Sequence, residues 1–337
     1  MAKPKLGLLL PNQGVVFGAI TVAELCDLAE EADATGAFDA MFVGDNLLAK
    51  PRMESVTLLS ALAMRTKTAR LGTACMASFP LRDPIVLAAQ WAALDNLCEG
   101  RSLLVACIGG GGGSGASANI IGGFQNEYKS FGIKTNERVG RLTEGMEVLR
   151  TLWQNDPASF QGRFYNFENI AVRPQPVQKP CPPIWIANNP GAFGKDRQVF
   201  QRATDRVGRL ADGWMTTMAT PEQFREAWDA VCEAAVAHGR KAEELESCLY
   251  YNVHIGGDRA ADQVAYEESK KFLDTYYSAD FGEDFVRMWT AIGSPEACAE
   301  KIRGFGEAGA QLISVRFTAY DQTAQCRRFV EEVVPLI

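Results

Sequence analysis

The sequence predicts an α/β fold, a (β/α)8 TIM barrel with insertions at the carboxyl ends of its strands. Short apolar runs alternate with amphipathic segments of 12 to 20 residues, and eight such units can be counted. The runs are almost continuously hydrophobic, as expected for strands that are covered on both faces. A doubly wound sheet would need a topological switch and usually has fewer strands. We therefore predict one barrel domain over residues 1–337.

Eight apolar segments are the predicted strands. They cover residues 5–10, 40–43, 70–75, 102–107, 183–187, 213–217, 249–255 and 312–317. Helix starts are marked by Thr21 with Glu24, which form a capping box, and by three cap residues before proline: Asp83-Pro84, Thr220-Pro221 and Ser294-Pro295. Glycines able to close helices stand at Gly36, Gly100, Gly239 and Gly309.

The remaining length lies in four segments that follow strands, residues 109–131, 160–182, 188–197 and 256–289. Barrel enzymes build their active sites from such loops. The first of these segments starts with five consecutive glycines and satisfies G-x-G-x-x-G at Gly110, Gly112 and Gly115. A dinucleotide fingerprint also needs a helix that opens at once, and residues 117–123 do not read as one. Close approach of bare backbone at Gly109 and Gly110 to a flat ring or a phosphate is favoured instead, against a plain flexible linker.

Charge and composition narrow the function. The formal net charge is −7 and no basic stripe is present, which argues against a nucleic-acid partner. No apolar run approaches the roughly 20 residues of a membrane span, and the start carries no cleavage-site pattern. Nine scattered cysteines without a Cys-x-x-Cys pair suggest neither a disulfide framework nor a metal site. A cytoplasmic protein is expected.

Three charged or titratable residues stand at strand ends. Asp45 follows an apolar strand, where a carboxylate is costly unless something uses it. It would either act at the site or cap the next segment. Arg316 interrupts the last strand and would bind a substrate carboxylate or a cofactor phosphate, or pair with an outer acid. His254 is the one of two histidines placed to act as an acid or base, although a satisfied core histidine is the simpler interpretation.

Longer motifs then point to a family. The strand, helix and strand of residues 65–107 are followed by NEYKSFG (126–132), NERVGRLTEG (136–145), FQGRFY (160–165), RPQPVQKP (173–180) and LADGW (210–214). In this order they resemble the bacterial luciferase-like superfamily of flavin-dependent monooxygenases and deazaflavin-dependent oxidoreductases. The resemblance covers most of residues 5–217 and implies both the barrel and a cofactor.

The resemblance assigns roles on the first strands. It implies a non-prolyl cis peptide at Ala74–Cys75 against the back of the cofactor ring, with Asp45 near the ring as acceptor or general base. Asn46 stands where relatives often carry a histidine, and is expected near the substrate. Cys107 matches a reactive cysteine of some luciferases, but no base stands beside it in sequence, so ring packing is favoured over catalysis.

Two further positions concern the cofactor's phosphate. Ile108 replaces the arginine that luciferases use for it. The loop of Ala187, Asn188 and Asn189 resembles one that holds the phosphate side chain, because asparagine amides and free N–H groups can donate to it. The same Asn-Pro-Gly sequence also makes a simple turn.

The expected activity is that of a two-component FMN-dependent monooxygenase, which takes reduced FMN from a separate flavin reductase and uses oxygen on a small organic substrate. The alternatives are hydride transfer with the deazaflavin coenzyme F420, and a noncatalytic flavin-binding subunit. The resemblance also implies a homodimer, for which Leu58, Leu59, Leu62 and Ala63 would supply an apolar stripe, unless that stripe faces the barrel.

Overall fold

A computed structural model describes residues 3–110, 118–189, 196–257 and 259–337. The strands are β1 (Lys5–Leu10), β2 (Ala40–Asp45), β3 (Arg70–Met76), β4 (Ser102–Ala106), β5 (Ala158–Gln161), β6 (Asn166–Ile170), β7 (Ile184–Ala187), β8 (Gly213–Thr216), β9 (Glu246–Ile255), β10 (Thr290–Gly293) and β11 (Leu312–Phe317). The helices are α1 (Val22–Ala34), α2 (Ser55–Arg65), α3 (Pro84–Leu97), α4 (Ala118–Ser130), α5 (Arg138–Gln154), α6 (Arg197–Leu210), α7 (Pro221–Ala237), α8 (Arg259–Tyr277), α9 (Glu283–Trp289), α10 (Pro295–Glu307) and α11 (Gln322–Arg328).

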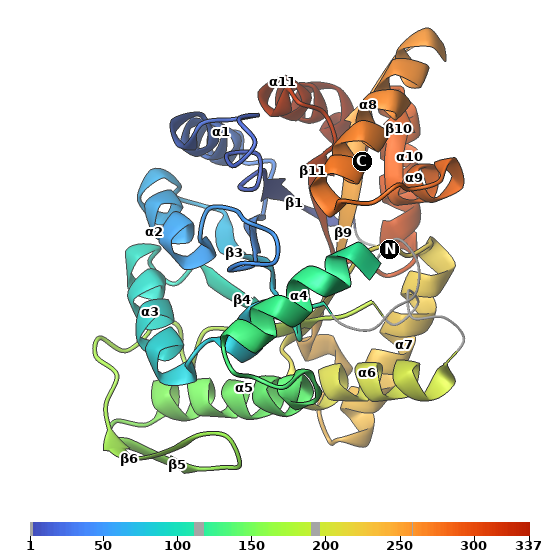
Figure 1. Ribbon diagram of the computed structural model, residues 1–337. Coiled ribbons are helices and arrows are strands. Elements are labelled where there is room, and N and C mark those ends of the chain that lie inside the picture. The colour runs from blue at the N-terminus through green and yellow to red at the C-terminus, as the bar shows by residue number, and fades with distance from the viewer. Residues whose placement is uncertain (1–2, 111–117, 190–195, 258) are drawn as a thin grey trace.

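The predicted barrel is confirmed. Parallel strands run in the order β9-β11-β1-β2-β3-β4-β7-β8, and the pairing of β8 with β9 closes the ring. Helices surround it, with α4 across the middle of the view (Figure 1). Side chains alternate between the barrel interior, which holds Leu9, Phe42, Val105 and Leu312, and a larger outer core against the helices.

Local chemistry sets the element boundaries as expected. Thr21 and Glu24 form the capping box, and Asp83, Thr220 and Ser294 cap the next three predicted starts. The four glycines expected at helix ends, at positions 36, 100, 239 and 309, all have positive φ. These signals are reliable because they depend on neighbouring residues alone.

The helix after the glycine run is a correction. Residues 118–123 were not expected to be helical, yet α4 begins at Ala118. Two glycines weaken a helix interior, but Phe124 and Tyr128 are buried on one face, so packing outweighs propensity. Gly112 and Gly115 of the sequence motif lie outside the described residues. A dinucleotide fold is still excluded, because the barrel strand order is not that of a doubly wound sheet.

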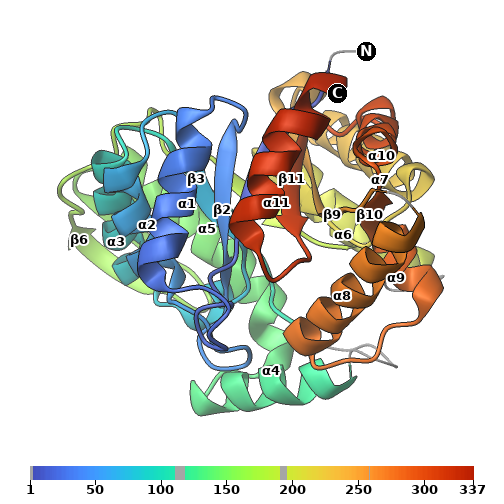
Figure 2. The same cartoon turned by 90° about the horizontal axis from the view of Figure 1, so that it is seen from above.

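Two insertions carry additional strands that were not predicted. The antiparallel hairpin β5–β6 projects beside α5 at the outside of the ring (Figure 1). β10 pairs with β9 outside the barrel order. Figure 2 shows α4 apart from the ring of helices, at the end of the barrel where the loop after β2 also lies.

The proposed dimer stripe does not exist as a surface. The side chains of Leu58, Leu59, Leu62 and Ala63 are at most 4% exposed within the single chain. They face the barrel, which was the alternative interpretation of the helix pattern. A homodimer stays a prediction, and these four residues do not support it.

Candidate active site

Three of the predicted site residues meet at the carboxyl ends of adjacent strands. Asp45 on β2 lies opposite Met76 on β3, and Met76 lies opposite Ala106 on β4. Cys75 and Cys107 are the neighbours of those paired residues in sequence. Since parallel strands end at one rim, the topology brings Asp45, Cys75 and Cys107 together at that rim.

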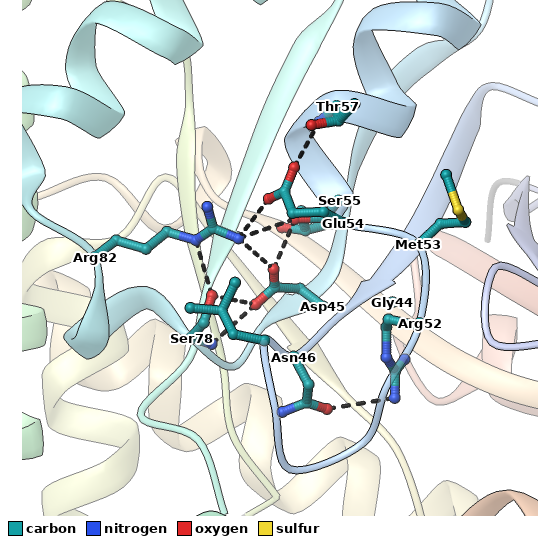
Figure 3. Close-up of polar contacts among 12 residues, drawn as sticks. Gly44, Asp45, Asn46, Arg52, Met53, Glu54, Ser55, Thr57, Ser78 and Arg82 are labelled. Carbon is teal, nitrogen blue, oxygen red and sulfur yellow. Dashed lines mark hydrogen bonds and ion pairs between the residues drawn. The ribbon is translucent and has the colours of Figure 1, made fainter. Parts of the chain in front are cut away.

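Asp45 is held in a closed network (Figure 3). One carboxylate oxygen accepts hydrogen bonds from the Ser55 hydroxyl at 2.7 Å and from Arg82 Nη2 at 2.8 Å. The other accepts from the Ser78 backbone N–H at 2.9 Å and hydroxyl at 2.6 Å. Arg82 also binds Glu54, the N-cap residue of α2, at 2.7 Å. The negative charge of Asp45 is therefore paired with a cation, and its two oxygens together accept four hydrogen bonds.

This geometry favours a structural role for Asp45. Burial and the acids Asp45 and Glu54 act in opposite directions on Arg82, and its pKa is raised on balance. The hydrogen bonds from Arg82, Ser55 and Ser78 occupy both oxygens of Asp45 and leave no proton-accepting position directed elsewhere. The sequence alternative, a carboxylate that fastens the next segment, matches the bond to Ser55 at the start of α2.

Asn46 is oriented differently from its neighbour. Its side-chain oxygen accepts from Arg52 Nη2 at 3.3 Å (Figure 3), while its side-chain nitrogen is buried without a partner in the described residues. A buried donor that is left unpaired costs free energy comparable to a lost hydrogen bond. Asn46 is thus a donor available to a ligand, as expected if it lies near the substrate.

Helix α4 fastens the loop after β2. Glu127 Oε1 accepts from the backbone N–H groups of Leu47, Leu48 and Ala49, at 3.0, 2.6 and 3.2 Å. One carboxylate therefore positions three consecutive residues, immediately before Lys50. No sequence pattern predicted this contact, because 78 residues separate Glu127 from Ala49.

The predicted cis peptide between Ala74 and Cys75 is present. The side chains of Ala74, Cys75 and Cys107 pack at the edge of the barrel interior and stay partly exposed. The neighbouring Cys75 thiol lowers the pKa of Cys107, and burial opposes this. The Gly109 N–H, which donates to the Cys107 sulfur at 3.4 Å, also lowers it. The register of β3 shifts at this place, and the small side chains there would offer little hindrance to a flat ring.

The segment after β4 approaches its surroundings closely. Gly109 has φ of 70°, and a Cβ there would stand 2.8 Å from the Ala77 carbonyl oxygen. Tyr128 donates to the Ile108 carbonyl at 2.8 Å, and Arg138 Nη1 donates to the Gly110 carbonyl at 2.8 Å. Glycine is required at position 109 for both conformation and space, and this backbone is held rather than loose.

In the segment after β7, some of the polar groups already form hydrogen bonds within the protein. Asn188 donates to the Ala203 carbonyl at 3.1 Å and accepts from the Trp214 indole at 3.0 Å. Asn189 uses its oxygen for the Thr217 N–H at 3.2 Å, so its amide nitrogen is the side able to donate. Ala187 is 9% exposed at the strand end. Residues 190 and 191 of the predicted turn lie outside the described residues.

His254 is covered by α8. Its Nδ1 lies 3.0 Å from the Ser269 hydroxyl and its Nε2 lies 3.6 Å from a Glu268 oxygen. Burial lowers the pKa of His254, and Glu268 offsets this in part. Its ring contacts are made with the helix and not with the predicted cofactor residues, which fits a satisfied core histidine.

Arg316 lies inside the barrel and is 2% exposed. Its Nε donates to Asn252 Oδ1 at 2.9 Å, and its Nη2 has no partner in the described residues. Aromatic rings surround it, with Tyr276 nearest at 4.4 Å from the ring centre. Its side-chain hydrogen bonds go to Asn252 and Tyr277, and no acid among the residues described supports the alternative of an outer ion pair.

Lys50, Arg52, Tyr276 and Tyr277 also gather around Arg316 and were not singled out from the sequence. Lys50 Nζ lies 4.1 Å from the centre of the Tyr277 ring, and Arg52 Nη1 donates to the Tyr276 hydroxyl at 3.0 Å. They come from the loop after β2 and from α8. The signal that could have found Lys50 and Arg52 is the presence of two basic residues within the segment that follows β2.

Other kinds of site find no support in the described parts of the chain. Across residues 3–110, 118–189, 196–257 and 259–337, no group of three or more His, Cys, Asp and Glu residues could hold a metal ion. No described helix is both long and apolar enough to cross a membrane.

A parallel eight-stranded barrel with polar groups, a cis peptide and tight glycines at its strand carboxyl ends defines a TIM-barrel enzyme. The particular family follows from comparison: residues 5–312 match the model of the luciferase-like monooxygenases. The chain belongs to this family and is an oxidoreductase.

The relatives match most of its length. The F420-dependent glucose-6-phosphate dehydrogenase of Nakamurella multipartita is 26% identical, over 93% of this chain and 92% of the relative. That of Amycolatopsis mediterranei is 24% identical over 93% of both chains. Among solved structures, the monooxygenase RslO1 from Streptomyces bottropensis superposes with a TM-score of 0.78 at 24% identity, covering 98% and 99% of the two chains. An F420-dependent secondary alcohol dehydrogenase reaches 0.78 at 16% identity over the whole of both.

Proposed function

We propose that the protein is a deazaflavin (F420)-dependent oxidoreductase that transfers hydride between the coenzyme and a small organic substrate. The observation that carries this proposal is the cis peptide at Ala74–Cys75, with the small, partly buried side chains of Ala74, Cys75 and Cys107 at the edge of the barrel interior. The full-length relatives named F420-dependent dehydrogenases support the choice of coenzyme. Ile108, in place of the arginine expected for the FMN phosphate, points the same way.

The residues present fit such a group. Ala74, Cys75 and Cys107 would support one face of the ring, and the backbone at Gly109 and Gly110 would lie along its edge. Ala187 and Asn189 would border the phosphate side chain. When bound, the coenzyme supplies the hydride acceptor or donor. The protein's own task is to hold the two reactants in contact and to exclude water.

Asn46 has a specific part in this arrangement. Its unpaired side-chain N–H group would donate to a substrate oxygen, and Arg52 fixes its orientation through the other end of the amide. Asp45 would not act as the base, because its oxygens are already occupied by Arg82, Ser55 and Ser78. It is a positioning residue that fixes the start of the Asn46 loop.

The FMN-dependent monooxygenase stays a prediction, and one titration separates the two. Purified apoprotein is titrated anaerobically with F420, FMN and reduced FMN, followed by fluorescence and calorimetry. Selective binding of F420 is expected. Selective binding of reduced FMN, with oxygen uptake in the presence of a flavin reductase, would overturn the proposal. If none of the three binds, the proposal that the protein uses F420 would be wrong.

A matched pair of glycines locates the site. Gly109→Ala adds a Cβ 2.8 Å from the Ala77 carbonyl, whereas Gly132→Ala, at a similar φ of 66°, meets nothing within 4 Å. Both changes carry the backbone cost of a non-glycine residue at positive φ, roughly 1 kcal/mol. We expect only Gly109→Ala to weaken coenzyme binding, by about tenfold or more, which corresponds to about 1.4 kcal/mol. Equal affinities in the two variants would contradict the placement.

A further inference from the structure

Three basic side chains converge on one place in the barrel mouth. Arg316 comes from β11, while Lys50 and Arg52 come from the loop after β2. Tyr276 and Tyr277 at the end of α8 lie between them. The Arg316 guanidinium carbon is 4.4 Å from the Tyr276 ring centre, and the Lys50 nitrogen is 4.1 Å from that of Tyr277. The cluster of Lys50, Arg52 and Arg316 is called the cationic cluster below.

The cationic cluster lacks a counter-charge. Within the described residues, none of its three members lies within 4.0 Å of a carboxylate oxygen, although Arg82, at the same end of the barrel, holds two acids. Arg316 is 2% exposed, and an isolated buried cation is costly. Burial, followed by Arg52 and Arg316, lowers the pKa of Lys50 well below its ordinary value. Arg316 thus keeps a positive charge that no carboxylate of the described residues compensates, whereas burial of Lys50 and the neighbouring cations disfavour the charged form of Lys50.

Unpaired polar atoms accompany the charge. Arg316 Nη2, Asn252 Nδ2, the Tyr250 hydroxyl and Asn46 Nδ2 are buried and have no partner among the described residues. Asn252 is fixed because its oxygen accepts from Arg316 Nε. Three of these four atoms can only donate hydrogen bonds, and the tyrosine can also donate. A group that accepts several hydrogen bonds and carries negative charge would match them.

We propose that the cationic cluster binds the anionic group, a carboxylate or a phosphate, of an organic substrate. Arg316 and Lys50 would contact the anion. Arg52 acts as a positioning residue, since it holds both Tyr276 and Asn46, at 3.0 and 3.3 Å. That bond to Asn46 connects the anion site to the proposed reaction site. The identification of the ligand as the substrate rests on the proposed function, whereas anion binding itself does not.

An internal counter-charge is the competing explanation. Burial opposes ionisation of Tyr276, but Arg52 and Arg316 lower its pKa, and Tyr277 and Tyr250 lie beside the same guanidinium. A tyrosinate would be visible in the ultraviolet difference spectrum at neutral pH between the wild type and Tyr276→Phe. We expect no tyrosinate signal. A signal equal to one ionised tyrosine would mean that the cluster is neutralised internally and would overturn the proposal.

The binding test uses apoprotein, so it is independent of any coenzyme. Benzoate and phenyl phosphate are titrated by calorimetry beside benzamide, a neutral molecule of similar shape. At least one anion should bind tenfold or more tightly than benzamide, and the comparison of the two anions distinguishes carboxylate from phosphate. Equal binding of the anions and benzamide would contradict the proposal. Anion binding in a protein that does not bind F420 would sink the proposed function alone.

Variants assign the binding to the cluster. Lys50→Gln and Arg316→Gln should each weaken anion binding tenfold or more and leave benzamide unaffected. The control is Lys67→Gln, at an exposed lysine in the turn before β3. Lys50 makes ring contacts and no side-chain hydrogen bond in the described residues, so its variant keeps the fold testable even if Arg316→Gln does not. Unchanged anion affinity in folded Lys50→Gln would overturn the proposal.

Discussion

Asp45 and Arg316 are buried to the same degree at the same end of the barrel, yet their surroundings are opposite. Asp45 is 3% exposed and meets one guanidinium, two hydroxyls and a backbone amide. Arg316 is 2% exposed and meets one amide oxygen, one phenol and aromatic rings, with one nitrogen unpaired. Burial alone therefore does not mark a functional group. What distinguishes the two is whether the protein itself completes the group's partners.

The largest expected effect on stability is at Asp45, the buried ion whose partners the protein itself supplies. Arg82→Met removes the cation from a carboxylate whose side chain is 1% exposed. Breaking one partner of a buried ion pair costs about 3–5 kcal/mol of unfolding free energy. Denaturant unfolding followed by circular dichroism measures it.

The control for Arg82→Met is Arg65→Met. Arg65 also binds two acids, but its side chain is 42% exposed. Exposed pairs contribute about 0–1 kcal/mol. If Arg82→Met cost no more than its control, Asp45 would not be the structural carboxylate described above.

Asp33, at the opposite end of the barrel, is a second buried acid whose hydrogen bonds the protein completes, and the pH dependence of stability tests its role. Asp33 is buried and accepts from the backbone of Lys67, Thr68 and Ala69. Burial alone would raise the pKa of Asp33, but these hydrogen bonds lower it. Its contribution is therefore present above the ordinary pKa of 3.8 and is lost as pH falls through the lowered value.

Asp33→Asn should cost about 1.5–3 kcal/mol at neutral pH, since hydrogen bonds to charged groups are the stronger ones. The difference from the wild type should shrink as the pH is lowered below 4. Unfolding midpoints at pH 7, 5 and 3.5 measure it. A difference that is constant with pH would show that the charge of Asp33 plays no part.

The smallest effect on stability is expected at Arg316. Arg316→Gln removes a cation that no acid in the described parts of the chain compensates, so the unfolding free energy should change by less than about 1 kcal/mol and in either direction. Thermal unfolding with and without saturating anion measures both properties. Wild type should gain about 2.7 kcal/mol at a ligand concentration 100 times its Kd, and the variant should lose that gain at the same concentration. A loss of several kcal/mol without ligand would place Arg316 among the structural charges.

Much of the barrel could be predicted from the sequence, because its strands and helix ends depend on local patterns. β1 and β11 begin and end at the predicted residues. β9 begins at Glu246, three residues before the predicted start at Leu249, and Glu246 is paired there with Arg70. β10 has four residues and pairs outside the barrel. It is too short for a hydrophobic periodicity to reveal it in the sequence.

The candidate site could be predicted only in part. Charges that interrupt apolar strands, Asp45 and Arg316, were detectable because burial of an ion demands an explanation. Their roles were not, since Arg82 and Lys50 approach from other elements. Tyr276 and Tyr277 lie in an insertion whose path over the barrel depends on packing of distant segments. Resemblance, and not local pattern, predicted the cis peptide at Ala74–Cys75.

The contact of Glu127 with Leu47, Leu48 and Ala49 has a consequence for engineering. The three residues bonded to Glu127 end one position before Lys50. Helix α4 and the loop after β2 therefore form one unit for the design of variants. Transplanting a relative's loop alone would leave the carboxylate of Glu127 facing amides in new positions. A new substrate preference is therefore best introduced by exchanging the loop and the helix together.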